Sequence, residues 1–460
     1  MEAIVTPDEM RAIDAAAPDP LDVLVDRAGA AVAREAIRML GGAYGRRVVV
    51  IAGPGNNGAD GRVAAERLRR RGVTVRVVDA RMRPPIISGA DLVIDAAYGT
   101  GFRDEWIAPE VGDSLVLAVD VPSGLDALTG AASDGVLRAD RTITFQALKP
   151  GLLLGRGPDL AGGVTIADVG LDVSGATRHR VGRVDAGGWW PTRSADAHKW
   201  RGAVKLVAGS ADMPGAAQLA SAAALRSGAG IVSLLTPEQR VTARAEVVTS
   251  TAPAGAVVET ALADIGRFGS LVIGPGLGRA DAVLLAARQL VAEAPVPVVV
   301  DGDALFACAW SADGAGPLLA ARHLPTVLTP HDGEFRHLTG RRPGPDRIAE
   351  ARELAAVFES IVLLKGPTTV VAGPPVAGSS EGPVRVIDHG DDRLATPGSG
   401  DVLAGMIGAA LASGGDPLDT TAAAAWLHAE AAHHGPREGL VAGDLVELLP
   451  AAITASRRAS

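Results

Sequence analysis

Short apolar runs, each ending in a loop rich in glycine and carboxylates, recur throughout the chain. In the first half, runs of strand length lie at residues 47–52, 73–78, 91–96, 115–119, 141–145 and 164–167. Helix-sized or loop-sized spacers separate them, and this alternation is typical of a mostly parallel sheet with helices on both faces. Ligands of such sheets bind at the carboxyl ends of the strands. The loops that follow the strands are therefore where we expect functional residues.

The second half repeats the pattern without a fixed short period, which excludes a repeat array. Strands are predicted at 204–208 and 231–235, and later strand-like runs end in the loops 274–278, 301–305, 329–335 and 365–369. Between 172 and 196 the apolar periodicity fades into a polar stretch, where we place the linker. We therefore predict an α/β protein of two domains, residues 1–185 and 186–460.

Composition limits the classes of partner. The 44 basic and 53 acidic residues give a net charge of -9, so no general attraction to nucleic acid or to an anionic membrane is expected. No apolar run reaches the ~18 residues of a membrane helix. The single cysteine, Cys308, rules out an intrachain disulfide and favours a reducing compartment. We expect a cytoplasmic protein that binds small molecules and forms a homo-oligomer.

The segment 394–403, Leu-Ala-Thr-Pro-Gly-Ser-Gly-Asp-Val-Leu, predicts an anion site. Pro397 and Gly398 break the preceding extended segment, Ser399 is a good N-cap, and an apolar run from Val402 starts a helix. The first amides of that helix lack internal partners and attract phosphate. Asp401 in the first turn suits a base that deprotonates a hydroxyl attacking that phosphate. The alternative is an aspartate that only complements the helix dipole.

Three loops of the first half carry polar side chains at strand ends. Residues 53–61, Gly-Pro-Gly-Asn-Asn-Gly-Ala-Asp-Gly, open a helix predicted at 62–71 and suit a phosphate or pyrophosphate cradle, with a tight turn as the alternative. The loops 95–101 and 120–126 follow the next strands. Asn57, Asp95 and Ser123 are oxygen ligands suited to a hard cation, and Asp120 is placed to exchange protons.

The loops of the second half supply parts of a phosphoryl-transfer site. Lys365, Thr368 and Thr369 suit nucleotide phosphates, His331 can hydrogen bond a substrate, and Glu334 can order Mg²⁺ through water. A turn is the alternative for the Lys-Gly pair, and a structural role is the alternative for the histidine. Three more histidines, at 428, 433 and 434, lie in a helical stretch. Because 428 and 433 are five apart, we predict packing or surface roles for them rather than zinc ligation.

The motifs of the first half resemble, in order, those of the NAD(P)H-hydrate epimerase family from about residue 5 to residue 171. They are Gly-Pro-Gly-Asn-Asn-Gly-Ala-Asp-Gly, Val-Ile-Asp-Ala-Ala-Tyr-Gly-Thr-Gly, Val-Asp-Val-Pro-Ser-Gly-Leu-Asp and Thr-Phe-Gln-Ala-Leu-Lys-Pro-Gly-Leu. The resemblance implies a Rossmann-like three-layer sandwich in which Asp120 contacts the substrate and Asn57, Asp95 and Ser123 hold K⁺. It also implies that the hydrate site is lined by Asn56, Asn57, Gly58, Ala59, Asp60, Gly99, Thr100, Gly101, Phe102, Arg103, Asp104 and Glu105. One departure is Ala59, where the family pattern has glycine.

The motifs of residues 196–450 resemble the ADP/ATP-dependent NAD(P)H-hydrate dehydratases, which have a ribokinase-like fold. They include His-Lys-x-x-Gly, Gly-Pro-Gly-Leu-Gly, Leu-Thr-Pro-His-Asp-Gly-Glu-Phe, Leu-Lys-Gly-Pro-Thr-Thr and Thr-Pro-Gly-Ser-Gly-Asp-Val-Leu-Ala-Gly. The resemblance implies that Ala216, Gly276, His331 and Asp401 contact the hydrate. It assigns nucleotide contacts to Lys365, Gly366, Pro367, Thr368, Thr369 and Gly400. Gly302 stands where the pattern has alanine between two aspartates.

The order of the two halves resembles the fused bifunctional hydrate repair enzymes. The resemblance implies that the first domain interconverts the R and S hydrates of NADH and NADPH (NADHX and NADPHX). The second would dehydrate the S form at the expense of ADP or ATP with Mg²⁺, and ADP would give AMP and phosphate. Two alternatives are a small-alcohol kinase of the ribokinase-like group and a nucleotide-sensing module without turnover.

Overall fold

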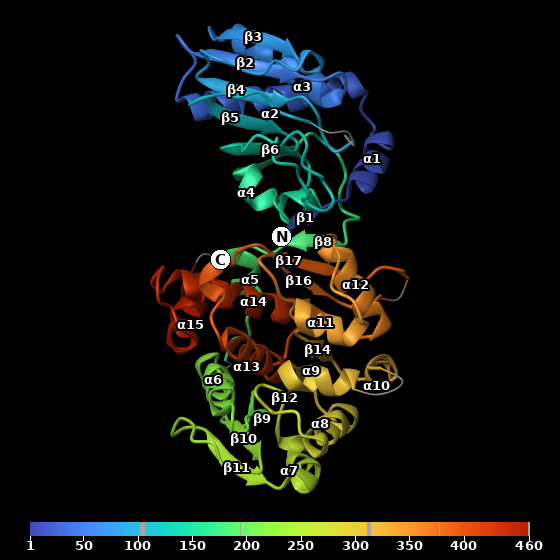
Figure 1. Cartoon of the computed structure of the whole chain (residues 1–460), viewed down its shortest axis with the longest axis vertical. Helices are drawn as coiled ribbons and strands as arrows, with labels where there is room; N and C mark the ends of the chain where they lie inside the picture. The colour runs from blue at the N-terminus through green and yellow to red at the C-terminus, as the bar shows by residue number, and fades with distance from the viewer. Residues whose placement is uncertain (102–105, 194, 311–313, 377, 459–460) are drawn as a thin grey trace. The chain divides into compact units, whose positions relative to one another are not determined.

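The chain folds into two compact α/β units, which a computed structural model describes at residues 1–101, 106–193, 195–310, 314–376 and 378–458 (Figure 1). One unit comprises Glu2–Ala176, and the other comprises Thr177–Ser460 with Met1. The division falls within the stretch in which the apolar periodicity fades. Mainly parallel sheets in both units confirm the α/β class. No described helix combines the length and the apolarity that crossing a membrane requires.

The sheet of the first unit has the strand order β3-β2-β4-β5-β6-β7, and every neighbouring pair is parallel. Its strands begin and end within one residue of the predicted bounds, because buried parallel strands are continuous apolar runs. They are β2 (Arg47–Ala52), β3 (Thr74–Asp79), β4 (Leu92–Ala96), β5 (Leu115–Val119), β6 (Arg141–Phe145) and β7 (Gly163–Ala167). A short β1 (Glu2–Ile4) precedes them, and its Ile4 bridges to Leu148.

Helices α2 (Leu21–Leu40) and α3 (Asn56–Arg69) cover one face of this sheet. The other face is covered, in the described residues, by loops and short helical turns, with Ile87 and Trp106 packed on Val49 and Val93. The layer on this second face is irregular because glycine, proline and aspartate interrupt the connections after β4 and β5. The short helical elements of the unit are α1 (Pro7–Ala15), η1 (Ala80–Met82), η2 (Pro150–Leu152) and α4 (Gly157–Ala161).

Helix α3 begins at Asn56, earlier than the predicted start at 62, with Gly55 as its N-cap. A Cβ at Gly58 would lie 1.9 Å from the carbonyl oxygen of Gly53, and one at Gly61 would lie 2.6 Å from the Cβ of Ala96. These glycines let the first turns of the helix press against the preceding loop and against β4. The polar motif at 56–60 is therefore helical and is held against the carboxyl ends of the strands.

The sheet of the second unit runs in the order β8-β17-β16-β15-β14-β13-β12-β9-β10-β11. From β15 to β11 all pairs are parallel, whereas β15, β16 and β17 form an antiparallel meander. The strands are β8 (Arg178–Arg180), β9 (Val204–Val207), β10 (Val232–Pro237), β11 (Val248–Ala252), β12 (Ser270–Ile273), β13 (Val298–Val300), β14 (Thr326–Leu328), β15 (Ile361–Leu364), β16 (Thr369–Ala372) and β17 (Val384–Ile387).

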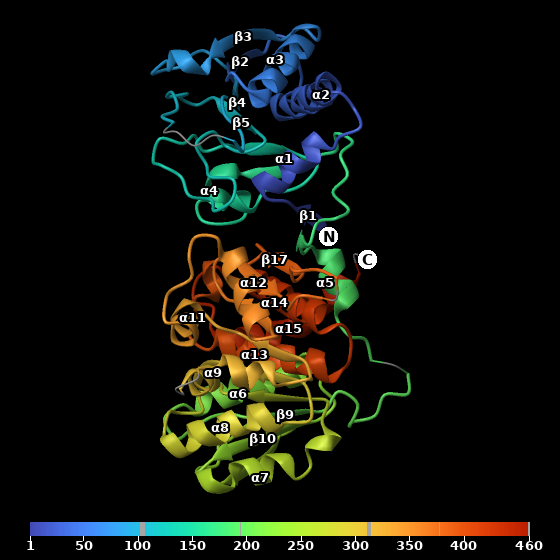
Figure 2. The same ribbon diagram turned by 90° about the vertical axis from the view of Figure 1, so that its right-hand side faces the viewer.

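Two layers of helices enclose this sheet (Figures 1 and 2). One layer contains α5 (Arg183–Trp189), α6 (Pro214–Arg226), α13 (Ser399–Ala412), α14 (Pro417–His433) and α15 (Ala442–Arg457). The other contains α7 (Val257–Leu262), α8 (Asp281–Glu293), α9 (Gly302–Ala309), α10 (Gly316–Ala320), α11 (Asp332–Thr339) and α12 (Arg347–Val357). The single turns are η3 (Ala254–Ala256), η4 (Ile265–Arg267) and η5 (Asp392–Leu394). A Cβ at Gly405 would lie 2.1 Å from the oxygen of Ala220, so α13 packs backbone to backbone on α6.

Candidate active sites

A cavity of about 690 Å³ lies at the carboxyl ends of the strands of the first unit. The loops after β2, β4 and β5 supply its polar wall, and Met10, Leu24, Phe145 and Leu171 supply an apolar wall. The polar lining includes Arg11, Asp14, Asn56, Asn57, Asp60, Arg83, Tyr98, Gly99, Thr100, Gly101, Asp120 and Lys149. An apolar cavity with a few convergent polar groups is the usual form of a small-molecule site.

Asp120 and Lys149 form a buried ion pair in this cavity. The Lys149 side chain is 1% exposed, and its ammonium nitrogen lies 2.7 Å from Oδ1 of Asp120. It also donates hydrogen bonds to Oγ1 of Thr144 at 3.0 Å and to the oxygen of Phe145 at 3.1 Å. The backbone of Asp120 has a φ of 66°, which costs a non-glycine residue conformational energy and is found mostly at functional sites. The carboxylate of Asp120 is thus fixed in one orientation.

Asp60 is a second carboxyl group of this cavity, close to Asp120, and it is protonated. Burial and the nearby carboxylates of Asp120 and Asp14 raise its pKa to about 8. Asp60 therefore holds a proton at neutral pH while Asp120 is paired with an ammonium. Asp60 can therefore donate a proton, and the Asp120 carboxylate held by Lys149 is placed to accept one.

The three predicted K⁺ ligands have oxygens suited to a hard cation. Ser123 donates from Oγ to Oδ1 of Asp95 at 2.6 Å and from its amide to Oδ2 at 2.9 Å. Burial raises the pKa of Asp95, although these hydrogen bonds oppose the rise. Both polar atoms of the Asn57 side chain are buried without a partner in the described part of the chain. A buried amide oxygen in that state is what a cation would satisfy, so the residues fit K⁺.

In the second unit, the helix that carries Asp401 begins at Ser399, and Gly398 with a φ of 89° is the N-cap. The expectation that Ser399 caps this helix is wrong, because its Oγ donates to the oxygen of Leu394 at 2.8 Å. Gly398 has no side chain to cap the helix, and the Ser399 amide donates to the oxygen of Thr396 at 3.2 Å, which leaves the amides of Gly400 and Asp401 for a ligand. These amides and the dipole of the helix are thus available to an anion.

Lys365 follows β15 and lies among carboxylates at this helix end. Its Nζ is 3.0 Å from Oδ1 of Asp301 and 3.5 Å from Oε2 of Glu334. A Cβ at Gly400 would lie 3.4 Å from the same nitrogen, so the ammonium sits against the first turn of α13. Burial lowers the pKa of Lys365, but the two carboxylates outweigh burial and raise it. Lys365 is therefore cationic.

Asp401 has a strongly perturbed carboxyl group. Burial and the carboxylate of Asp301 raise its pKa to about 7, against the opposing effect of Lys365. A carboxyl group with a pKa near neutral pH is a stronger base than an ordinary aspartate and still ionises under physiological conditions. A carboxyl group with a pKa shift of this size, next to a lysine and a helix N-terminus, is a candidate functional group.

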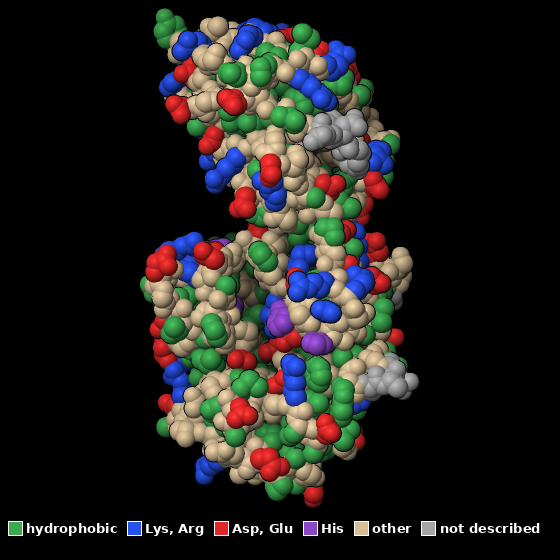
Figure 3. All heavy atoms as spheres, viewed as in Figure 1, with side chains coloured by type: hydrophobic (Ala, Val, Ile, Leu, Met, Phe, Trp, Pro, Cys, Tyr) green, Lys and Arg blue, Asp and Glu red, His purple; other side chains and the backbone are tan. Residues whose placement is uncertain are grey.

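Ala216 and Gly276 meet beside this site. Gly276 has a φ of 57°, and a Cβ there would lie 2.6 Å from the Cβ of Ala216. His331 is the N-cap of α11, where its Nδ1 accepts hydrogen bonds from the amides of Gly333 at 2.9 Å and Glu334 at 3.3 Å. The hydrogen of the neutral ring is then on Nε2, which can donate to a substrate. Histidine and acidic side chains gather over α9 and α11 at the edge of a hollow (Figure 3).

Comparisons with known proteins match both units. The family described as NAD(P)H-hydrate dehydratase matches residues 204–454, and the family described as YjeF-related protein N-terminus matches residues 21–88 and 79–151. The bifunctional NAD(P)H-hydrate repair enzyme Nnr of Mycobacterium leprae is 37% identical over 446 residues, covering 90% of this chain and 89% of that protein. The protein of the same name from Moorella thermoacetica is 34% identical, covering 97% and 96%.

The chain belongs to the bifunctional NAD(P)H-hydrate repair enzymes.

The structures agree with this family assignment. The second unit resembles the ADP/ATP-dependent NAD(P)H-hydrate dehydratase of Bacillus subtilis co-crystallised with ATP/Mg²⁺, at 30% identity and a TM-score of 0.52. That match covers 60% of this chain and 97% of the Bacillus protein. A ribokinase-like protein of Enterococcus faecalis, with 20% identity and a TM-score of 0.52, shows the same fold.

Most of the residues predicted for the hydrate site of this repair enzyme's first unit lie together. Asn56, Asn57, Asp60 and the segment 99–101 line the cavity, whereas Gly58 and Ala59, in the same first turns of α3, are not among the lining residues. Ala59 has no positive φ, so its methyl group causes no backbone strain. The remaining predicted residues, Phe102, Arg103, Asp104 and Glu105, lie outside the described part of the chain.

The nucleotide segment predicted in the second unit connects β15 to β16. Gly366, Pro367 and Thr369 line a cavity of about 60 Å³ that they share with Asp391 and His428. Burial lowers the pKa of His428 to about 4, so this ring is neutral. Gly302, the second departure from the family pattern, has a φ of 51°, which glycine adopts without strain.

Sequence reasoning missed Lys149 and Asp301 as site residues. Lys149 lay within a motif quoted for the resemblance, but nothing in the sequence shows that its ammonium reaches Asp120. A lysine beside apolar residues directly after a strand was the available signal. Asp301 likewise ends a predicted strand, where its carboxylate holds Lys365.

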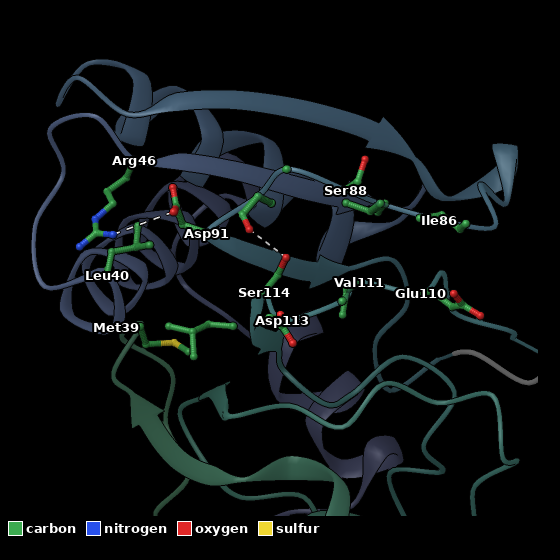
Figure 4. A pocket seen from close by; sticks show the side chains of 15 residues that line it. Met39, Leu40, Arg46, Ile86, Ser88, Asp91, Glu110, Val111, Asp113 and Ser114 are labelled. Atoms are coloured by element: carbon green, nitrogen blue, oxygen red, sulfur yellow. Dashed lines mark hydrogen bonds and ion pairs between the residues drawn. The ribbon is translucent and has the colours of Figure 1, made fainter.

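A second hollow of about 560 Å³ lies at the opposite edge of the sheet of the first unit (Figure 4). Its residues precede β2, β4 and β5, and they include Arg46 and Asp91, whose charged groups are 4.0 Å apart. Ser114 closes one side by donating to the oxygen of Ala90 at 2.9 Å. Because parallel sheets bind ligands at the carboxyl ends of their strands, we place the active site of this unit in the larger cavity.

Proposed function

We propose that this chain restores hydrated NADH and NADPH in two steps. The first unit interconverts the R and S hydrates, and the second removes water from the S hydrate with ADP or ATP as the phosphoryl donor. Transfer from ADP leaves AMP and places a phosphoryl group on the hydrate oxygen. That oxygen then leaves as phosphate, the neighbouring ring carbon loses a proton to solvent, and the ring double bond forms. Two features support the proposal: relatives named as bifunctional repair enzymes match nearly the whole chain, and each unit carries one polar site at its strand ends.

The Asp401 carboxyl group at the N-terminus of α13 carries the assignment of the dehydratase step. We assign it the role of base that takes the proton from the hydrate hydroxyl as the oxygen attacks the phosphoryl group. Its pKa of about 7 suits proton abstraction at neutral pH. The first amides of α13 would stabilise charge on the phosphoryl oxygens, and Lys365 lies close enough to assist them. Ala216, Gly276 and His331 would position the hydrate.

Nucleotide binding is assigned to the segment 365–369 and to Gly400. Magnesium bound to the nucleotide would supply charge neutralisation for the phosphoryl group. The carboxylates of Asp301 and Glu334, both next to Lys365, fit a hydrated Mg²⁺ because this ion keeps much of its water shell. The Bacillus relative crystallised with ATP/Mg²⁺ supports this choice of cofactor.

Epimerisation is assigned to Asp120, Asp60 and Lys149. Asp120 and Asp60 would act as a base and an acid on the hydrate, and Lys149 would hold the Asp120 carboxylate in place. K⁺ held by Asn57, Asp95 and Ser123 would contribute a fixed positive charge behind the loop that carries Gly99. A cytoplasmic location and a homo-oligomeric state, both predicted from the sequence, belong to the same proposal.

Replacing Asp401 by asparagine tests the dehydratase assignment. We expect D401N to lose dehydration of the S hydrate while interconversion of the R and S hydrates continues. The matched control is D281N, because Asp281 also lies in a first helical turn, that of α8, and is exposed. Both reactions are followed by separating the two hydrates and NADH chromatographically. A D401N variant that dehydrates at the wild-type rate would remove Asp401 from the chemistry.

A further inference from the structure

Two imidazoles and a carboxylate converge at the end of α14, away from the residues assigned above. Glu430 and His433 lie on the last turns of this helix, and His389 comes from the loop after β17. Nε2 of His389 is 2.7 Å from Oε2 of Glu430 and 3.2 Å from Nδ1 of His433. One ligand atom of each residue lies within 4.8 Å of the other two. Helical spacing did not reveal this group because one member comes from another segment.

The proton arrangement at this point is unusual. Nε2 of His389 can carry either one hydrogen or one lone pair, yet it faces two other atoms that can both accept a hydrogen bond. When Nε2 of His389 carries the hydrogen, Glu430 and His433 compete for it. A cation in the place of that hydrogen would receive lone pairs from all three atoms at once.

The surroundings hold each side chain by the atoms that are not needed for a metal ion. Nε2 of His433 is 3.3 Å from Oδ2 of Asp391, and a carboxylate on the far nitrogen is the usual orienting partner of a metal-bound histidine. Arg183 donates to Oε1 of Glu430 at 2.7 Å, which leaves Oε2 free to bind. The ring of His389 stacks on Trp426 with a centroid distance of 4.4 Å.

The neighbouring cations do not block the point of convergence. Arg393 and Arg437 pair with Asp391, Arg183 pairs with Glu430, and none of these guanidinium groups is paired with the imidazole atoms. The side chains of His389 and His433 are 28% and 30% exposed, so an ion can enter from solvent. Glu430 is 5% exposed and forms the floor of the group.

We propose that His389, Glu430 and His433 bind a divalent transition ion of the Zn²⁺ class, with water completing its coordination. Two imidazoles and one carboxylate suit such ions and not Mg²⁺, which takes oxygen ligands. The ion would tie the loop after β17 to α14. Because Asp391 in that loop lines the cavity beside Gly366 and Thr369, binding would also stiffen one wall of the segment assigned to the nucleotide.

The test is calorimetric titration of the full, tag-free, chelator-treated chain with ZnCl₂ in excess Mg²⁺. The Mg²⁺ occupies sites that are made only of carboxylates. We expect one equivalent of Zn²⁺ to bind, and Co²⁺ to give a visible absorption band of the intensity typical of low coordination numbers. H389Q and H433Q should each weaken binding by at least about 100-fold, because each removes a direct ligand. The matched control is H434Q, since His434 is the next residue and approaches only Oε1 of Glu430.

Melting curves of the metal-free proteins show whether each variant is folded, and H433Q leaves the stacked His389–Trp426 pair intact if H389Q is unstable. Added Zn²⁺ should raise the melting temperature of the wild type and of H434Q but not that of H433Q. Absence of saturable Zn²⁺ binding by the wild type would overturn the proposal. Equal binding by wild type and H433Q, or a loss confined to H434Q, would overturn it as well.

Discussion

D401N should stabilise the second unit at alkaline pH while it abolishes dehydration. Folding raises the pKa of Asp401 from 3.8 to about 7. Between these two values the unfolded chain releases the proton of this carboxyl group and the folded chain keeps it, so ionisation favours unfolding. The unfavourable contribution of Asp401 therefore begins near pH 4 and is complete above pH 7. It is absent from D401N, whose amide does not titrate.

The size of the stability difference between D401N and the wild type follows from the pKa shift of Asp401. A rise of about 3 pKa units at ~1.4 kcal/mol per unit gives about 4 kcal/mol of lost stability in the wild type above pH 7. The free energy of unfolding of D401N should thus exceed that of the wild type by about this amount at pH 8, and the gain should disappear near pH 4.

Urea unfolding followed by tryptophan fluorescence measures this difference. Trp106 is in the first unit and the other tryptophans, at 189, 190, 200, 310 and 426, are in the second, so the signal reports mainly the unit of interest. Nucleotide and Mg²⁺ are left out because ligand binding would add its own stabilisation. D281N serves as the control and should show no such dependence on pH. A gain for D401N that is the same at pH 4 and pH 8 would refute the assignment of a perturbed carboxyl group.

Three further predictions concern the other residues of the two sites. D120N should lower the rate of epimerisation at least about 100-fold and leave dehydration of pure S hydrate intact, as measured by chromatographic separation of the hydrates. Epimerisation by the wild type should decline above about pH 8, where Asp60 loses its proton, and a rate that still rises there would exclude Asp60 as the acid. G276A should raise the KM for the hydrate about tenfold, because the residue has a φ of 57° and its new methyl group would lie 2.6 Å from the Cβ of Ala216. Unchanged hydrate kinetics in G276A would place the hydrate elsewhere.

The parts of the fold that could be predicted from the sequence are those in which burial requires a recognisable run of apolar residues. Strands such as β2 and β5 are continuous apolar runs, and their bounds match the prediction. The start of α3 was missed because Asn56, Asn57 and Gly58 are typical of a turn, and only contact with the preceding loop makes them helical. Ser399 was assigned as an N-cap for a similar reason, since sequence shows the preference of serine but not the competing carbonyl group of Leu394.

For the candidate sites too, one part could be predicted from the sequence and another could not. Loops after strands were located correctly because parallel strands bring their carboxyl ends to one edge. What the sequence could not give is which side chains pair across that edge. Asp120 meets Lys149, and His389 meets Glu430 across a separation of 41 residues, through the meander and α14. The same limit applies to protonation, because the pKa of Asp401 depends on its burial and on Asp301, which only the folded chain supplies.

The most direct test of the central claim is recovery of the reduced-nicotinamide absorbance from a mixture of S and R hydrates. The purified chain is supplied with Mg²⁺, K⁺ and either ADP or ATP in separate reactions. We predict full recovery with at least one nucleotide, which would name the phosphoryl donor and require both units to be active. Recovery that stops once the S hydrate is spent would contradict an active first unit. No recovery with either nucleotide would contradict the repair function and favour a small-alcohol kinase.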